Sequence, residues 1–203
     1  MNKAENSKTK KMVVFDFDGT LTLCDSFPLF IFYAVGFWRA LWGFALYMPL
    51  LVMMKAGLYP NGKTKEKVLA HFFTGTNVSK FRDVCREFAR THKHILRPQG
   101  VDAMQKALAQ GAEVVVLSAS PRLWVQPFFS EMEVNVIGTE LEEDGQVLSG
   151  FLKGANCYGR EKVNRLKAAY PSINNYNIVA YGDSRGDKEL LQFAHEAHYK
   201  PFR

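Results

Sequence analysis

The chain of 203 residues has the length of one domain of ordinary size with room for a sizeable insertion. With 47% hydrophobic and 23% charged residues it can bury a core, and its composition excludes disordered, collagenous and disulfide-scaffold proteins. The net charge of +6 is uneven: residues 1–11 carry +3, residues 24–97 carry +7, and residues 12–23 and 98–203 together carry −4.

The first predicted element is a flexible basic tail over residues 1–11. The apolar run that follows extends only from Met12 to Phe15, so no signal peptide is predicted. Three cysteines without disulfide or zinc-ligand spacing favour a reducing compartment. We therefore expect a cytoplasmic protein.

Residues 24–97 show no strand pattern and are far too long for a plain loop, so we expect an inserted helical cap. Its last helix is marked by core-facing residues spaced three and four apart, namely Val78, Phe81, Cys85, Phe88 and His92. The basic residues of the cap accompany no motif that reads DNA or RNA, so we expect no nucleic acid partner.

Within this cap, residues 27–54 carry one charge, Arg39, and nine aromatic residues, a third of the chain's total. As one helix the segment would be roughly 42 Å long, enough to cross a bilayer, but Gly36, Gly43 and Pro49 favour bends. Three interpretations stay open: a helical hairpin buried in the cap, a surface that contacts a membrane, and a transmembrane span. The net positive charge of the cap favours contact with an anionic membrane surface.

The rest of the chain alternates strand and helix patterns. Short β-branched runs predict strands buried on both faces of a parallel sheet, at residues 12–15, 113–117, 134–137 and 177–181. Helical patterns occur at residues 98–110, 159–170 and 184–194. Asp144-Gly145 between apolar residues predicts a β-hairpin over residues 140–150. Residues 12–23 and 98–203 therefore predict a core of the α/β class with a doubly wound, mostly parallel sheet.

Two carboxylates follow the first strand, in the sequence Asp16-Phe17-Asp18-Gly19-Thr20. They lie at the carboxyl edge of the predicted sheet, where open α/β sheets bind ligands. Because two like charges this close repel each other, the pair needs a cation or a shared proton. Gly19 permits a tight turn that presents backbone N–H groups to an anion. An Asx turn at a strand end explains the same residues without any chemistry.

A second acidic cluster, with Asp183 and Asp187, follows the last predicted strand. Oxygen ligands without a nearby Cys or His favour Mg²⁺. Stabilisation of a helix N-terminus by negative charge is the alternative, and it explains Asp187 better than Asp183.

Two phosphate-binding candidates complete the set. Ser118 lies at the end of a predicted strand and offers a hydroxyl group beside a helix N-terminus. Ala119 is the next residue. Lys162 opens a predicted helix, where a cation opposes the helix dipole unless it reaches an anion. A capping serine and a surface lysine are the alternatives.

These motifs occur in the order Asp16/Asp18, Ser118, Lys162 and Asp183/Asp187. The pattern resembles the haloacid dehalogenase superfamily of phosphohydrolases over residues 12–194. The helical insertion after the first motif resembles the phosphoserine-phosphatase-like subfamily. The apolar segment 27–54, with Gly159-Arg160-Glu161-Lys162 and Gly-Asp-Ser-Arg-Gly-Asp, is similar to the phosphatidylglycerophosphatase branch, whose substrate is a membrane lipid.

The resemblance implies a mechanism. Asp16 attacks phosphorus and forms an aspartyl phosphate, and Asp18 is the general acid and base. Ser118 and Lys162 hold phosphoryl oxygens. Mg²⁺ is bound by Asp16, the main-chain carbonyl of Asp18 and Asp183. The supporting residues of the site are then Gly19, Thr20, Ala119 and Asp187.

The implied function is a Mg²⁺-dependent phosphomonoesterase, with a lipid head-group phosphate such as phosphatidylglycerophosphate as the leading substrate. A soluble phosphomonoester such as phosphoserine is the alternative, although Gly186 and Ala119 replace the Asn and Gly that phosphoserine phosphatases usually carry there. A phospho-accepting regulatory domain is a hypothesis from another class. It does not need Asp18, so Asp18→Asn separates it from a phosphatase.

Overall fold

The computed structural model describes residues 10–202, and most of the predicted tail lies outside the described residues. Lys10 and Lys11 differ from that prediction, because they belong to the first strand, β1 (Lys10–Asp16). They pair with Tyr176 and Asn177 of β6 (Tyr176–Gly182). Charged side chains are compatible with the exposed end of a strand, so the amino-acid composition does not reveal that β1 starts at Lys10.

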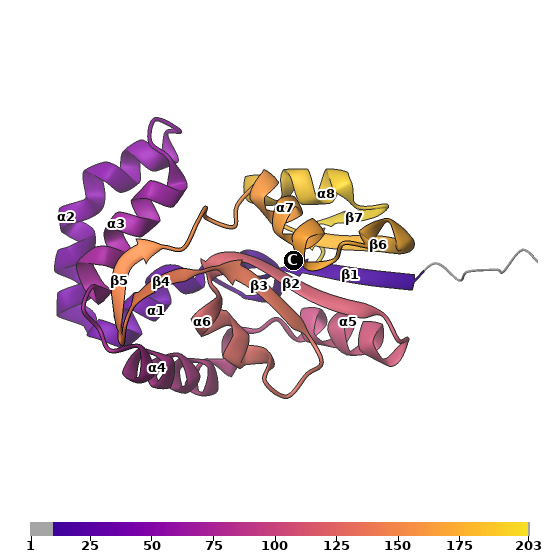
Figure 1. The fold of residues 1–203 in the computed structure, drawn as a ribbon, viewed down its shortest axis with the longest axis horizontal. Coiled ribbons are helices and arrows are strands. Elements are labelled where there is room, and N and C mark those ends of the chain that lie inside the picture. Colours follow the sequence, from indigo (N-terminus) through magenta and orange to yellow (C-terminus); the bar gives the residue numbers. More distant parts are fainter. Residues whose placement is uncertain (1–9, 203) are drawn as a thin grey trace, which may run out of the picture.

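A five-stranded parallel sheet forms the core, in the order β3-β2-β1-β6-β7 (Figure 1). β1 is central, between β2 (Glu113–Pro121) and β6. β3 (Asn135–Thr139) and β7 (Glu196–Tyr199) form the two edges. The predicted doubly wound, mostly parallel α/β fold is confirmed.

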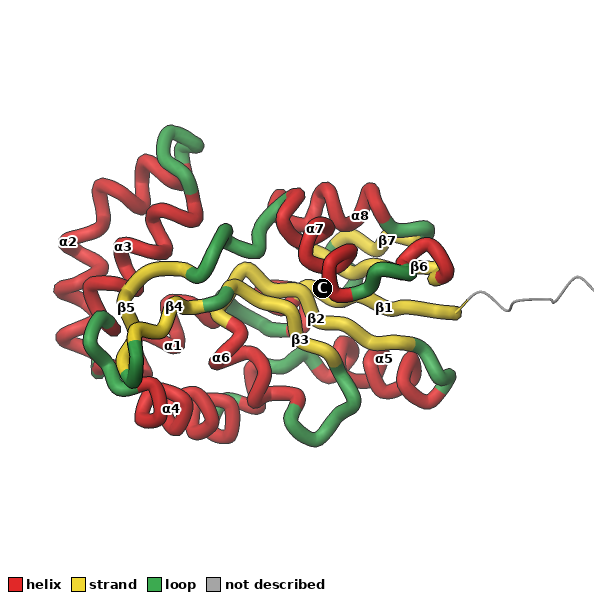
Figure 2. The backbone as a smooth tube through the Cα atoms, in the orientation of Figure 1, coloured by secondary structure: helices red, strands yellow, loops and turns green. Residues whose placement is uncertain are grey.

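Side chains of β1 alternate between two apolar clusters, one on each face of the sheet. Val13 and Phe15 point into one cluster, and Met12 and Val14 point into the other. Helices cover both faces (Figure 2): α5 (Pro98–Ala109) on the first, α7 (Arg160–Ala169) and α8 (Lys188–Phe193) on the second. This period of two is what a strand buried on both faces requires.

The C-terminal part differs from the prediction in two ways. The predicted helix over 184–194 is a 3₁₀ turn, Arg185–Asp187, followed by the shorter helix α8. The strand β7 has no counterpart in the prediction, because its four residues form no apolar run. Polar and charged side chains are typical of such an edge strand, since they discourage pairing with another chain.

The cap helices lie together beyond the carboxyl edge of the sheet (Figure 1) and are α1 (Ser26–Val35), α2 (Phe37–Lys55), α3 (Asn61–Phe73) and α4 (Val78–Thr91). The predicted helical cap region is therefore present, while the boundaries 24 and 97 stay a prediction. α4 starts at Val78, where Asn77 caps it by accepting a hydrogen bond from the main-chain N of Lys80 at 3.1 Å.

The predicted hairpin consists of β4 (Leu141–Asp144) and β5 (Val147–Leu152). It packs on the cap, because a Cβ atom added to Gly150 would lie only 3.0 Å from the Cα atom of Ala70 in α3. The short helix α6 (Arg122–Val125) contacts α4 from the core side. The hairpin and α6 thus connect the cap to the sheet.

The apolar segment 27–54 forms two separate helices, because Gly36, with φ of 84°, lies between α1 and α2. α1 packs into the cap through Phe27, Phe30 and Ile31, which are buried. α2 buries few side chains and exposes a row of apolar ones, including Phe37, Trp38, Leu41, Trp42, Leu46, Met48, Val52 and Met53. The interpretation as a buried hairpin is therefore correct for α1 and wrong for α2.

Phe30 joins the cap to the core, since its ring stacks on Trp124 of α6 with centroids 4.3 Å apart. We expect Phe30→Ala to lower the free energy of unfolding by about 3–5 kcal/mol, because it leaves a cavity in a fully buried cluster. Phe37→Ala is the control, since that ring is 59% exposed and its loss changes stability by about 0.5 kcal/mol or less. Urea denaturation measures both, and equal losses would contradict the packing described here.

Candidate active site

Asp16 ends β1 and is buried at the carboxyl edge of the sheet. Its Oδ2 accepts a hydrogen bond from Thr20 Oγ1 at 3.0 Å. The chain turns back between them through Gly19, which has φ of +80° and where an added Cβ atom would lie 2.5 Å from Asp183 Oδ2. Glycine is needed here both for the backbone conformation and for the close approach of Asp183.

Lys162 is buried between two carboxylates. Its Nζ lies 2.5 Å from Asp16 Oδ1 and 2.6 Å from Asp187 Oδ1, and it donates to the carbonyl of Leu117 at 3.2 Å. These contacts match the three N–H donors of an ammonium group. The interpretation of Lys162 as a surface lysine is therefore wrong, and the prediction that it reaches an anion from the first turn of α7 is correct.

Asp187 connects Lys162 to the loop that follows β6. Its Oδ2 accepts hydrogen bonds from Ser184 Oγ at 2.8 Å, from Ser184 N at 3.0 Å and from Asp183 N at 3.2 Å. The capping interpretation of Asp187 is thus correct, and the structure also brings Asp187 into contact with Lys162. Carboxylate oxygens of Asp16, Asp183 and Asp187 all lie within 4.8 Å of one another.

Hydroxyl groups and a main-chain N–H group hold Asp18. Its Oδ2 accepts hydrogen bonds from Ser120 Oγ at 2.6 Å and Ser118 Oγ at 3.3 Å, and its Oδ1 accepts one from Ser26 N at 2.8 Å. Ser26 begins α1, so the cap itself helps to position Asp18. Ser26 belongs to no motif singled out in the sequence, Ser120 follows the Ser118 motif without a predicted role, and only the fold brings both to Asp18.

The charges of the site depend on burial and on close pairing. Burial raises the pKa of Asp16 to about 7, with Asp187 adding to this effect and Lys162 opposing it. Burial acts to lower the pKa of Lys162, but Asp16 and Asp187 raise it above its usual range. Burial acts to raise the pKa of Asp187, but Lys162 and Ser184 hold it below its usual value. Lys162 therefore stays protonated and offsets the repulsion between the carboxylates.

These side chains line a cavity of about 670 Å³, whose polar wall includes Asp16, Asp18, Lys162 and Asp183. The cap supplies an apolar wall of Phe27, Phe44, Leu51, Met54 and Val68. Three charged cap residues, Asp25, Lys55 and Lys65, also line the cavity. Sequence patterns do not single them out, because Lys65 lies among other basic residues, Lys55 ends α2, and Asp25 is the N-cap of α1.

Gly186 precedes Asp187, at the position where phosphoserine phosphatases usually carry Asn. The ring of Tyr158 occupies the space beside it, since an added Cβ atom would lie 2.4 Å from Tyr158 Cε2. Tyr158 also lines the cavity. The replacement of Asn by Gly186 thus makes room for the ring of Tyr158, which forms part of the wall of the same cavity.

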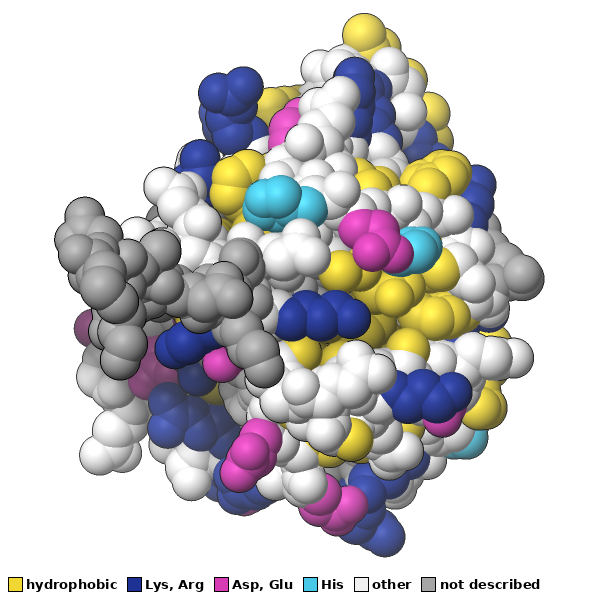
Figure 3. Space-filling view, turned by 90° about the vertical axis from the view of Figure 1, so that its right-hand side faces the viewer, with side chains coloured by type: hydrophobic (Ala, Val, Ile, Leu, Met, Phe, Trp, Pro, Cys, Tyr) yellow, Lys and Arg dark blue, Asp and Glu magenta, His cyan; other side chains and the backbone are white. Residues whose placement is uncertain are grey.

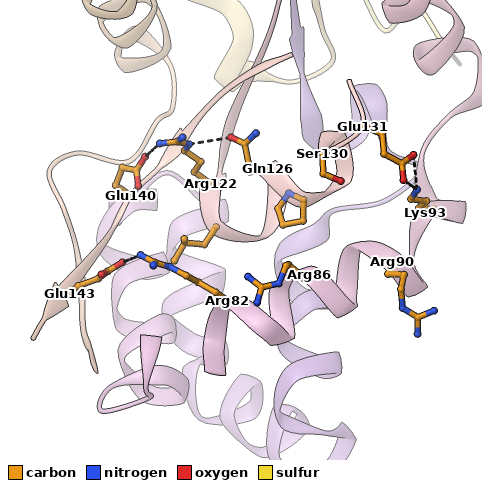
Figure 4. Close-up of a pocket in the computed structure, with 12 residues that line it drawn as sticks. Arg82, Arg86, Arg90, Lys93, Arg122, Gln126, Ser130, Glu131, Glu140 and Glu143 are labelled. Atoms are coloured by element: carbon orange, nitrogen blue, oxygen red, sulfur yellow. Dashed lines mark hydrogen bonds and ion pairs between the residues drawn. The ribbon is translucent and has the colours of Figure 1, made fainter. Parts of the chain in front are cut away.

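A second cavity, of about 650 Å³, lies between α4 and the segment that begins with α6 (Figure 4). Ion pairs surround it: Arg82 with Glu143 at 2.8 Å, Lys93 with Glu131 at 3.3 Å, and Arg122 with Glu140 at 3.4 Å. None of the predicted site residues lines this cavity. Exposed pairs of this kind contribute little stability each, and we assign them to the contact between cap and core.

The acidic cluster fits Mg²⁺ by the chemistry of its donors. Asp16 and Asp183 each offer a carboxylate oxygen, and Mg²⁺ uses few protein carboxylates while keeping places for water and phosphate oxygens. Both oxygens of Asp187 accept hydrogen bonds from Lys162 or the Ser184 loop. Asp18 directs its carboxylate to serines, so its main-chain carbonyl is the donor that the family resemblance implies.

The family model of haloacid dehalogenase-like hydrolases matches residues 13–192. The chain therefore belongs to this family, and the predicted haloacid dehalogenase-type phosphatase, an enzyme of the hydrolase class, is confirmed at the level of the family. Membership of a hydrolase family disfavours the regulatory-domain hypothesis.

One curated relative is Protein CicA of Caulobacter vibrioides, 37% identical over 201 residues, which are 95% of this chain and 86% of that protein. Among solved structures, a protein of unknown function from Bordetella pertussis Tohama I superposes with a TM-score of 0.82 at 20% identity, over 93% of this chain and 89% of that chain. A phosphoserine phosphatase solved as a phospho-aspartyl intermediate analogue superposes with a TM-score of 0.65 at 18% identity, over 94% and 86%. These two structures share the fold.

We expect Gly19→Ala to weaken Mg²⁺ binding by roughly 10- to 100-fold, because the methyl group displaces Asp183. The positive φ adds strain of about 1–2 kcal/mol, seen as a lower melting temperature. Gly57→Ala is a matched control, since Gly57 has φ of +76° but no atom within 4 Å of an added Cβ. It loses similar stability and keeps its Mg²⁺ affinity in a calorimetric titration. Equal Mg²⁺ affinities for the two variants would contradict the close contact with Asp183.

Proposed function

We propose that the protein is a Mg²⁺-dependent phosphomonoesterase that forms an aspartyl phosphate on Asp16. The different surroundings of the two motif carboxylates carry this proposal. Asp16 lies 2.5 Å from the ammonium group of Lys162, whereas Asp18 is held by Ser118 and Ser120. The first arrangement suits a nucleophile that must approach an anionic phosphate, and the second suits a residue that carries protons.

In the proposed reaction, a carboxylate oxygen of Asp16 attacks phosphorus while the bond from phosphorus to the leaving oxygen breaks. Asp18 donates a proton to the leaving oxygen, which departs as an alcohol. Asp18, now a carboxylate, then takes a proton from water as that water attacks the phosphorus. The bond from phosphorus to Asp16 breaks, and inorganic phosphate and the free Asp16 carboxylate result. The phosphoserine phosphatase solved as a phospho-aspartyl intermediate analogue is a parallel on the same fold.

Ser118 and Lys162 are the residues we assign to the phosphoryl oxygens, and Lys162 would reach one by giving up its contact with the carbonyl of Leu117. Both are buried, where hydrogen bonds to a charged group are strong. Lys162 lines the cavity, and so does Ala119, which follows Ser118. Asp187 keeps Lys162 in position through its contact at 2.6 Å. Bound Mg²⁺ would offset the negative charge of the cluster and of the phosphate. Asp16, Asp183 and the main-chain carbonyl of Asp18 would hold it.

A lipid head-group phosphate such as phosphatidylglycerophosphate is the substrate we favour. The cap wall of the cavity is apolar, and three of its residues, Phe44, Leu51 and Met54, lie on the inner face of α2. Such a wall suits the apolar part of a lipid next to a phosphate held at the sheet edge. The alternative, a small soluble phosphomonoester such as phosphoserine, is supported by Asp25 and Lys65, two charged groups in the same cavity.

The outer face of α2 supports a membrane-bound location. Among the described residues, α2 is the one helix long and apolar enough to cross a membrane, and little of it is buried. Trp38 and Trp42 are 71% and 75% exposed, and Arg39, next to Trp38 in the chain, is exposed as well. The opposite end of the molecule carries charges of both signs that surround a smaller group of apolar side chains (Figure 3).

We infer that α2 lies in the surface of an anionic membrane. Its tryptophans suit the interfacial region, and each nearby Lys or Arg adds about 1 kcal/mol of attraction to anionic lipid. The protein would then work in the cytoplasm, peripherally attached to the inner face of the membrane. Arg39 would lie at the level of the lipid head groups.

We expect Asp16→Asn to abolish phosphate release from phosphatidylglycerophosphate in mixed micelles, a loss of roughly 10⁴-fold or more. Asp18→Asn should lose roughly 10²- to 10⁴-fold, because the leaving oxygen no longer receives a proton. Removal of Mg²⁺ with EDTA should stop release, and added Mg²⁺ should restore it. Asp102→Asn, in an exposed ion pair on α5, serves as the control. Phosphate release that survives Asp16→Asn would refute the proposed mechanism.

We expect the purified protein to sediment with vesicles that contain anionic phospholipid. Replacing Trp38 and Trp42 together by Ser should weaken this binding at least ~10-fold, because two large aromatic surfaces no longer leave water. Tyr199→Ser is the control, since this ring is 59% exposed on β7, far from α2. Protein that stays in solution with all vesicles, or an equal loss in the Tyr199 variant, would refute the membrane surface.

A further inference from the structure

Lys65 reaches from the cap to the catalytic edge of the sheet. It lies in α3, and its Nζ donates a hydrogen bond to the main-chain carbonyl of Ala119 at 3.1 Å. Ala119 follows Ser118, so this ammonium group lies beside the phosphate-binding strand end. The same Nζ lies 5.3 Å from the centroid of the Phe27 ring. Two cap helices, α1 and α3, and the core strand β2 therefore fix its position.

This cation has no carboxylate within ion-pair distance among residues 10–202. A charged group held partly out of water without an ion pair is unfavourable unless a ligand supplies the opposite charge. Burial accordingly lowers the pKa of Lys65, while the more distant Asp18 and Asp25 oppose that shift. The surroundings of Lys65 thus favour an anion in the cavity.

Counting donors separates Lys65 from Lys162. Lys162 has acceptors for three N–H bonds, namely Asp16, Asp187 and Leu117. Lys65 has one such acceptor in the described structure, Ala119, although an ammonium group has three N–H bonds. Two donors of Lys65 therefore remain for a ligand in the cavity that it lines.

The position of Lys65 indicates which part of a substrate it meets. The carbonyl that Lys65 contacts belongs to Ala119, and the residues on either side of it, Ser118 and Ser120, both donate hydrogen bonds to Asp18 Oδ2. Asp18 is the group that would protonate the leaving oxygen. Lys65 therefore lies on the side of the leaving group, and Lys162 lies on the side of Asp16.

We propose that Lys65 forms a subsite for a second anionic group, carried by the leaving part of the substrate. This inference rests on the proposed phosphatase function and narrows its substrates to phosphomonoesters whose alcohol carries its own negative charge. A phosphodiester next to the ester, as in a phospholipid head group, or a carboxylate, as in a phosphorylated hydroxy acid, supplies the same oxyanion. A singly charged oxyanion can accept both remaining N–H donors of Lys65.

Three soluble substrates test the subsite. Glycerol 3-phosphate has an uncharged leaving group, glycerophosphoglycerol phosphate adds a phosphodiester to the same alcohol, and phosphoserine carries a carboxylate. The variant Lys65→Met keeps the apolar stem over Phe27 and removes the charge. Lys63→Met, on an exposed position of the same helix, is the matched control. Lys65→Arg keeps the charge and should restore part of the activity.

We expect Lys65→Met to lower kcat/KM by about 10- to 100-fold, mainly through KM, for at least one of the two substrates with a charged leaving group. For glycerol 3-phosphate the loss should stay below about 3-fold, as for Lys63→Met on all substrates. A large loss with glycerophosphoglycerol phosphate identifies the phosphodiester as the anion, and a large loss with phosphoserine identifies the carboxylate.

Other results overturn the subsite. An equal loss on all three substrates would place Lys65 on the transferred phosphate or in the fold, and no loss would remove it from the site. In both cases the wild-type protein still releases phosphate, so the proposed function stands. Absence of Asp16-dependent release from every substrate by the wild-type protein would instead refute the proposed function, and the subsite with it.

Discussion

The active site depends on bringing several carboxylates to one edge of a parallel sheet without mutual repulsion. β1 and β6 are adjacent and parallel, so Asp16 and Asp183 must end near each other. Lys162 offsets this charge by contacting both Asp16 and Asp187. Its amine reaches them because α7 starts directly above the sheet edge, after Gly159 with φ of 61°. The start of α7 thus lies where its lysine can offset the charge of the carboxylates at the sheet edge.

The same constraint explains why two aspartates of one motif differ. Asp16 is the last residue of a buried strand, and its carboxylate contacts Lys162 and Thr20 beside Asp183 and Asp187. Asp18 lies two residues later, in the turn made possible by Gly19, and contacts Ser118, Ser120 and the start of α1 instead. Since α1 belongs to the cap, movement of the cap would change the surroundings of Asp18 and leave those of Asp16 intact.

The sequence predicts most of the core and the motif residues, because periodicity defines buried strands and parallel strands place their carboxyl ends together. It does not predict β7, whose polar residues carry no pattern, or the contacts of Ser26, Ser120 and Lys65. Those contacts join residues far apart in the chain, and their types are common on surfaces. The sequence also does not predict the exposure of α2, because an apolar helix has the same residue pattern whether protein or lipid covers it.

α2 has two apolar faces, and in the proposed function that property links a membrane-bound location to a lipid substrate. Ala40 and Gly43, with Phe44, Leu51 and Met54, face the cap and the cavity, whereas the tryptophans face outward. A helix is only about 10 Å across, so a lipid at the outer face lies close to the catalytic cavity. The phosphate of a membrane lipid would then reach Asp16 while its chains stay near the bilayer. A soluble substrate would need the inner face of this helix alone, and the outer row of aromatic side chains would have no use.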